Sequence, residues 1–168
     1  MKIQMLKALV ATTALAAMGL GATAANAATA DGTARAKILR QVTVTNTSDL
    51  QFGTIVTGAA ASTVGVSTAG ARTCGGGLVC SGTTTAANFN IVGTAAQIVT
   101  ISVPGTVSLT SGANSMSATL VSSSAPTNLA TLSAGGTASF TVGGTLSVGA
   151  AQADGDYAGT FTATVNYQ

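Results

Sequence analysis

The chain contains no His, no Trp and no Glu, and 6% of its 168 residues are charged. Aromatic residues account for another 4%. Without His or Glu, the usual general bases are missing, and a Ser nucleophile has no evident partner to activate it. We therefore expect no enzymatic activity, no catalytic residue, no cofactor and no metal ion.

Positive charge is too scarce for a nucleic-acid partner. Beyond residue 27 the cations are Arg35, Lys37, Arg40 and Arg72, and four Asp residues balance them. Nucleic-acid binding requires a basic patch, so we expect no such partner. A chain with so little net charge is instead suited to association with its own copies.

Residues 1–27 have the pattern of a secretory signal peptide. Lys2 and Lys7 flank the start of an apolar run that is shorter than the ~20 residues of a membrane span. The run is followed by a small-residue cleavage site, so we expect cleavage between Ala27 and Ala28. The mature chain would be exported through the Sec pathway to the periplasm, and then to the cell surface or beyond, with no transmembrane segment.

The two cysteines, Cys74 and Cys80, flank a glycine-rich stretch of five residues. In an exported chain, such a pair is typical of a disulfide. Two thiols without His cannot complete a tetrahedral zinc site, and a thioredoxin-like motif needs two intervening residues.

What the sequence does contain is β-strand patterning. Small and β-branched residues dominate, and 21 residues are Gly. The C-terminal stretch alternates, and its odd positions are Gly155, Tyr157, Gly159, Phe161, Ala163, Val165 and Tyr167. A period of two with Thr on the other face predicts a half-buried strand. Nothing after this strand covers its second edge, which points to an earlier strand or another molecule.

An earlier alternation over Thr33–Thr45 predicts two β segments that break near Arg40. Its first half places Ala34, Ala36 and Ile38 on one face, and this half could be an ordinary first strand of the domain. A turn is expected at 46–49, followed by a strand over 50–56.

Further along the chain we expect a loop over 69–85, a hairpin that joins 88–93 to 97–103, and a hairpin over 140–148. The second hairpin would turn at Gly143-Gly144. Asp154-Gly155-Asp156 is interpreted as a surface turn, rather than a carboxylate pair or a calcium site. About ten short strands without a helix after residue 27 predict an all-β, immunoglobulin-like sandwich.

Several of these residues also carry a resemblance to known families. Tyr167 is penultimate and Gly155 is fourteenth from the end, as in chaperone–usher pilins. Leu50-Gln51-Phe52-Gly53 after an alternating leader is similar to the spore-coat-protein-U type of pilin. Together with Val142–Leu146 and the ending Gly155–Phe161, these motifs most closely resemble domain of unknown function family 4402, a group of bacterial secreted β proteins.

The pilin resemblance implies a mechanism. It implies a sandwich that lacks its last strand, with a leader (28–38) as donor strand and a domain over 39–168. Ala34, Ala36 and Ile38 of one subunit would insert beside the Tyr157–Tyr167 strand of the next. The partners would be other copies or related subunits, a periplasmic chaperone and an outer-membrane usher, in a surface fibre with a role in adhesion. The alternative is a monomeric, closed secreted sandwich that binds a carbohydrate or cell-surface component.

Overall fold

The computed structural model describes residues 27–168, so the expected signal peptide lies outside the described residues except for Ala27. The chain divides into two units, Met1–Ala36 and Lys37–Gln168, and all strands belong to the second. The strands are β1 (Thr43–Ser48), β2 (Thr54–Val56), β3 (Ser62–Val66), β4 (Arg72–Cys74), β5 (Val79–Ser81), β6 (Ala87–Val92), β7 (Ile98–Ser102), β8 (Thr106–Ser111), β9 (Asn114–Ser122), β10 (Leu129–Thr131), β11 (Thr137–Val148) and β12 (Thr164–Tyr167). No helix occurs in 27–168, so the expected all-β class is confirmed.

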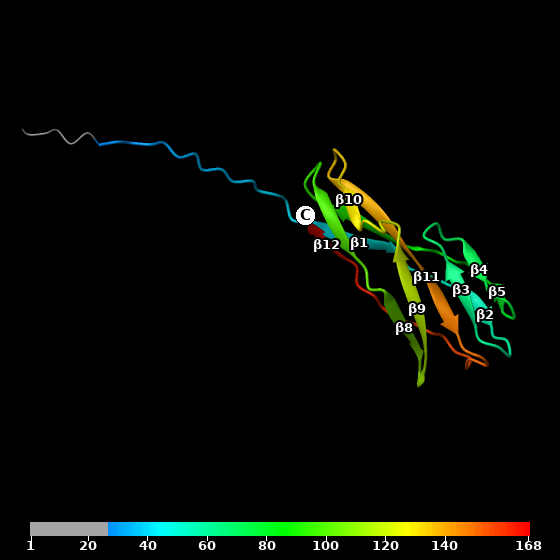
Figure 1. The fold of residues 1–168 in the computed structure, drawn as a ribbon. Helices are drawn as coiled ribbons and strands as arrows, with labels where there is room; N and C mark the ends of the chain where they lie inside the picture. The colour runs from blue at the N-terminus through cyan, green and yellow to red at the C-terminus, as the bar shows by residue number, and fades with distance from the viewer. Residues whose placement is uncertain (1–26) are drawn as a thin grey trace, which may run out of the picture. The chain divides into compact units, whose positions relative to one another are not determined.

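The largest sheet is built around β11, the long orange strand in Figure 1. β6 and then β3 pair along one edge of β11, while β9 pairs along the other. β1 extends the sheet beyond β6, β4 extends it beyond β3, and β8 extends it beyond β9. All these pairs are antiparallel. Together the seven strands form one layer of the domain.

The opposite layer is made of two smaller pieces. One is a three-stranded sheet in the order β10-β7-β12, and the other is the two-stranded ribbon β2–β5. Figure 1 shows the ribbon at the end of the domain away from β10 and β12. The arrangement is sandwich-like, as the alternation predicts.

The core accordingly has two clusters. The first is covered on both sides, because Phe89, Ile91 and Phe140 of the large sheet meet Val99, Ile101 and Val165 of the three-stranded sheet. The second comes almost entirely from one layer. Its buried members are Val64, Val66, Ala118, Leu146 and Val148 of the large sheet, with Phe52 against them.

The expected hairpin at Gly143-Gly144 is wrong, because β11 runs straight through both glycines. Neither has a positive φ, and both are buried. A Cβ on Gly143 would strike the Val66 carbonyl, and one on Gly144 would lie 2.8 Å from the Thr119 carbonyl oxygen. These glycines therefore permit close approach of neighbouring strands rather than a turn.

Four other expectations also fail. The segments 88–93 and 97–103 form strands β6 and β7, but these belong to different sheets and do not pair. The loop expected over 69–85 contains β4 and β5. β1 continues to Ser48 through an irregularity at Asn46, where a turn was expected. Residues 33–42 form no strand, so the first half of the alternating leader does not pair in this structure.

The strand expected over 50–56 is shortened to β2. Gly53 has a φ of 78°, and a Cβ there would lie 2.8 Å from an Arg72 guanidinium nitrogen. The backbone therefore turns out of the extended conformation at this glycine. Before the turn, Phe52 is buried in the second core cluster.

Candidate functional site

The C-terminal segment keeps its alternation but is a strand only at its end. Ala163 and Val165 are buried in the first core cluster, and Phe161 packs edge-on to Phe89 with 6.0 Å between ring centroids. Hydrogen-bonded pairing is continuous only from Thr164 to Tyr167, where β12 lies against β7. The face expected to be apolar therefore points inward over 161–167, whereas the regular strand is shorter than expected.

The first half of the segment makes different contacts. Ala158 forms a bridge with Thr110 of β8, and a Cβ on Gly159 would strike the Ser108 carbonyl. Gly155 has a φ of 149° and lies against Ser111. Both glycines of the ending thus bring the chain close to β8, which favours glycine at these two positions.

β12 is at the end of its sheet, with no strand on its second edge among the described residues. The tip of this strand is tied to the start of the domain by Tyr167. Its hydroxyl donates to the Arg40 carbonyl at 2.6 Å and accepts from the Thr94 backbone N–H at 2.7 Å. The Arg40 guanidinium also donates to the Gly93 carbonyl. The chain is therefore fixed at Arg40.

The residues predicted to donate a strand lie just before this point. Ala34 and Ala36 are exposed and belong to no strand. Ile38 is 91% exposed, the highest exposed fraction among the large hydrophobic residues of the described chain. These three side chains are therefore not used by the core of their own domain.

An open groove of about 760 Å³ lies over the second core cluster. One wall is the segment Leu50–Thr57, and the other is Gln152–Tyr157. The floor is apolar, with buried Leu146 and Val148 beside half-buried Leu109 and Met116. The groove exists because the ribbon β2–β5 covers only part of this cluster.

Polar contacts hold the C-terminal wall of the groove in place. The Tyr157 hydroxyl donates to the Ala153 carbonyl at 2.9 Å and accepts from the Gln152 side-chain amide at 2.8 Å. Gln152 and Tyr157 are both half-buried. This wall also carries the carboxylates of Asp154 and Asp156, which are exposed.

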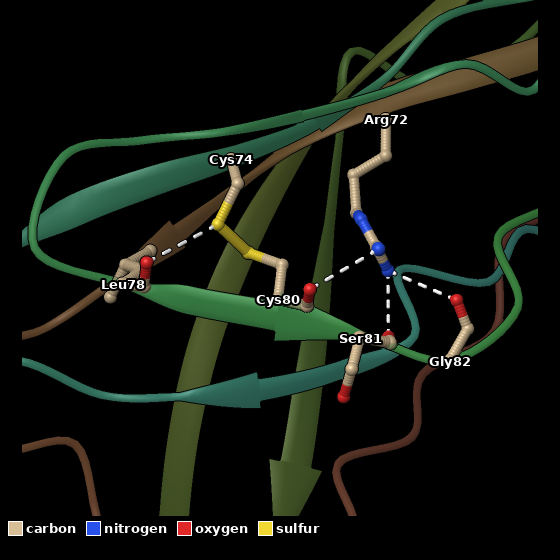
Figure 2. The surroundings of a disulfide bond; sticks show 6 residues. All are labelled: Arg72, Cys74, Leu78, Cys80, Ser81 and Gly82. Atoms are coloured by element: carbon tan, nitrogen blue, oxygen red, sulfur yellow. Dashed lines mark hydrogen bonds between the residues drawn. A yellow bond between two sulfur atoms is a disulfide. The ribbon is translucent and has the colours of Figure 1, made fainter.

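The opposite wall is braced by the disulfide, which the structure confirms between Cys74 and Cys80 with a Cα–Cα distance of 6.1 Å. Figure 2 shows Arg72 beside it, donating to the carbonyls of Cys80, Ser81 and Gly82 at 3.3, 2.6 and 3.1 Å. The disulfide and this guanidinium join β4 of the large sheet to β5 of the ribbon. The wall formed by 50–57 is thereby attached to the rest of the domain.

A second hollow, of about 930 Å³, lies between β8 and residues 158–164. Pairing closes it at both ends, through Thr110–Ala158 and Ser102–Thr164. It cannot admit an extended chain along its length unless one of these pairs opens. The groove over the second core cluster is the more enclosed of the two hollows.

Sequence reasoning missed most of this groove. In its floor, Leu109 of β8 pairs with Met116 of the neighbouring strand β9, and Leu146 comes from β11. Because β11 lies far away in the sequence, no local pattern brings Leu146 to the other two residues. Asp154 and Asp156 looked like turn formers, and their position on a wall has no sequence signal. A partial signal was the presence of both the Leu50–Gly53 motif and the Gly155–Phe161 ending, since Leu50–Gly53 and the first three residues of the ending line the same groove.

Residues 27–168 contain no group of three or more His, Cys, Asp or Glu that could hold a metal ion. In the same part of the chain, no helix is long and apolar enough to cross a membrane. The chemistry that the groove offers is apolar contact, main-chain hydrogen bonding and a pair of carboxylates at its rim.

No curated protein and no solved structure matches the chain. The model of one family matches residues 42–167, which covers β1 to β12 and both walls of the groove. The chain therefore belongs to the family described as "Domain of unknown function (DUF4402)".

Proposed function

We propose that the protein is a secreted structural subunit of a bacterial surface fibre, in which the groove accepts a strand from another subunit. The observation that carries the proposal is the open groove over the second core cluster, whose floor includes the half-buried Leu109 and Met116. The groove runs beside β2, which pairs only with β5 among the described strands. Single-layer apolar surface is stabilised by a covering layer, and an unpaired strand edge can hydrogen-bond an added strand.

The leader is a suitable source for that strand. Residues 33–38 alternate, their apolar side chains are exposed, and they take no part in the sheets of their own domain. Six extended residues span about 20 Å, a length comparable with the walls 50–57 and 152–157. Ala34 and Ala36 bury little area, at about 0.8 kcal/mol per methylene-sized group, so backbone pairing must supply much of the affinity.

Fibre assembly by this route also requires protection of the groove before assembly. In an exported subunit, a periplasmic chaperone would cover the open cluster, and an outer-membrane usher would guide exchange for the next subunit. We include both as partners in the proposal, together with a signal peptide over 1–27, export to the cell surface and a role in adhesion.

Deletion of Thr33–Ile38 tests the proposal. The deleted chain keeps all twelve strands, so it should fold and accept a leader peptide, but it should not form fibres. A matched pair of substitutions sharpens the result. Ala34→Asp with Ala36→Asp places charge on the face that enters the groove and should abolish assembly. Thr33→Asn, on the opposite face, adds no charge and should leave assembly intact.

Normal fibres from the deleted chain would exclude donor-strand assembly. The closed monomeric sandwich predicts a different result. In that case the purified full chain would remain monomeric at high concentration, and the amides of 152–157 would be protected from hydrogen exchange without any added peptide.

A further inference from the structure

The groove and the leader have opposite charge. Two carboxylates, Asp154 and Asp156, line the groove, and its lining contains no Lys or Arg. The nearby Arg72 is outside the lining and is engaged with three backbone carbonyls. The lining therefore carries a formal charge of −2 at neutral pH.

The leader segment 33–38 contains Arg35 and Lys37 and no acidic residue, which gives it a formal charge of +2. In an extended chain these cations occupy the face opposite to Ala34, Ala36 and Ile38. When the apolar face lies on the groove floor, the cations point outward, toward the exposed carboxylates of the rim.

We infer that Asp154 and Asp156 recognise the Arg35/Lys37 face of the leader of a second copy of this chain, and so orient and select the strand that enters the groove. This inference rests on the proposed strand addition and names its partner and its specificity-determining residues.

The stretch between Ile38 and Arg40 is too short to bring Ile38 to the groove of its own domain. The strand that enters the groove therefore comes from a second copy of the chain. Arg40 is fixed to Tyr167 at the tip of β12. The wall 152–157 lies ten or more residues before Tyr167 along an extended segment, a distance on the order of 30 Å. Ile38 is two residues from Arg40 and can reach only about 7 Å from it. The leader therefore cannot lay Ile38 into the groove of its own domain.

One existing contact competes with this recognition. The Lys37 ammonium donates to the Gln97 side-chain carbonyl at 2.6 Å, in an exposed position. Docking exchanges this hydrogen bond for the neighbour's carboxylates. Because the rim is exposed, each ion pair should change affinity by about two- to five-fold at low ionic strength and by little at high ionic strength.

The test measures binding of a synthetic peptide of residues 28–39 to the purified full chain, at low ionic strength and at about 0.5 M salt. Asp154→Asn with Asp156→Asn should weaken binding about four- to twenty-five-fold at low salt, and the loss should vanish at high salt. Asp49→Asn removes an exposed carboxylate outside the lining and should have no effect. Unchanged thermal unfolding midpoints will verify that the variants are folded.

Charge reversal completes the design. A peptide with Arg35→Asp and Lys37→Asp should bind the native chain weakly, but it should bind the Asp154→Lys, Asp156→Lys chain better than the native peptide does. Native peptide binding that is indifferent to both substitutions and to salt would overturn the charge recognition and leave strand addition standing. If peptides of either charge fail to bind, and copies of the chain do not cross-link, the proposed function fails as well.

Discussion

Gly143 shows how one hydrogen atom in place of a side chain can determine strand packing. Its Cα faces the Val66 carbonyl across the β11–β3 pair, so an added methyl group would force the strands apart. Gly143→Ala should lower the free energy of unfolding by about 1–3 kcal/mol, measured by urea denaturation. Gly76→Ala is the control, because a Cβ there meets nothing within 4 Å and should change stability by less than about 0.5 kcal/mol. Equal stability of both variants would show that β3 moves without cost.

Tyr167 connects the last strand to the first residues of the domain through two hydrogen bonds of one hydroxyl group. Tyr167→Phe leaves the ring in place and removes both bonds, to Arg40 and to Thr94. The free energy of unfolding should fall by about 1–2 kcal/mol, and the Thr94 amide should exchange faster with solvent. Tyr157→Phe is the matched control, since its hydroxyl contacts only the groove wall and should leave Thr94 unchanged. A Thr94 amide that is indifferent to Tyr167→Phe would contradict the predicted tie.

At the scale of strands, local patterns predicted which face of a strand is buried better than they predicted which strands pair. The alternation of β12 and the residues before it correctly placed Ala163 and Val165 inward, because a period of two fixes which side chains share a face. It could not show that β6 and β7 belong to different sheets, since the connection between them has the length and glycine content of a hairpin. The hairpin predicted at Gly143-Gly144 is wrong for a related reason. Glycine permits both tight turns and close contacts between strands, and only the neighbouring strands decide between them.

The disulfide predicts a local effect on the β2–β5 ribbon. Closing so short a loop restricts the unfolded chain by about 2 kcal/mol on the chain-entropy account. Cys74→Ser with Cys80→Ser should loosen β4 and β5 while the first core cluster keeps its packing. Trypsin cleavage after Arg72 measures this loosening, because the Arg72 side chain of β4 donates to three carbonyls at β5 in the native chain. Native chain should be cut after Arg35 and Lys37 in the exposed leader, and the variant also after Arg72. Equal resistance of Arg72 in both chains would show that the guanidinium contacts alone hold the ribbon.

At the scale of the whole molecule, the two core clusters differ in how completely they are covered. The first lies between two sheets, whereas the second has the large sheet on one side and a ribbon with an open groove on the other. On the proposed function, a strand added to the groove would cover the second cluster and stabilise the domain further. The low net charge adds to this tendency, since copies repel one another little at long range.

The proposed strand addition predicts that the leader stabilises the domain. A peptide of residues 28–39, added to the chain that lacks Thr33–Ile38, should stabilise the native state by about 2.7 kcal/mol at a hundred-fold excess over its dissociation constant. For a domain of this size, the melting temperature should then rise by about 5–10 °C. The amides of 50–57 and 152–157 should gain protection from hydrogen exchange, while those of β7 should change little. The same peptide with Ala34→Asp and Ala36→Asp should have no effect, because a desolvated carboxylate on the apolar floor costs more than the backbone pairing gains. Stabilisation by both peptides would show that the leader binds outside the groove.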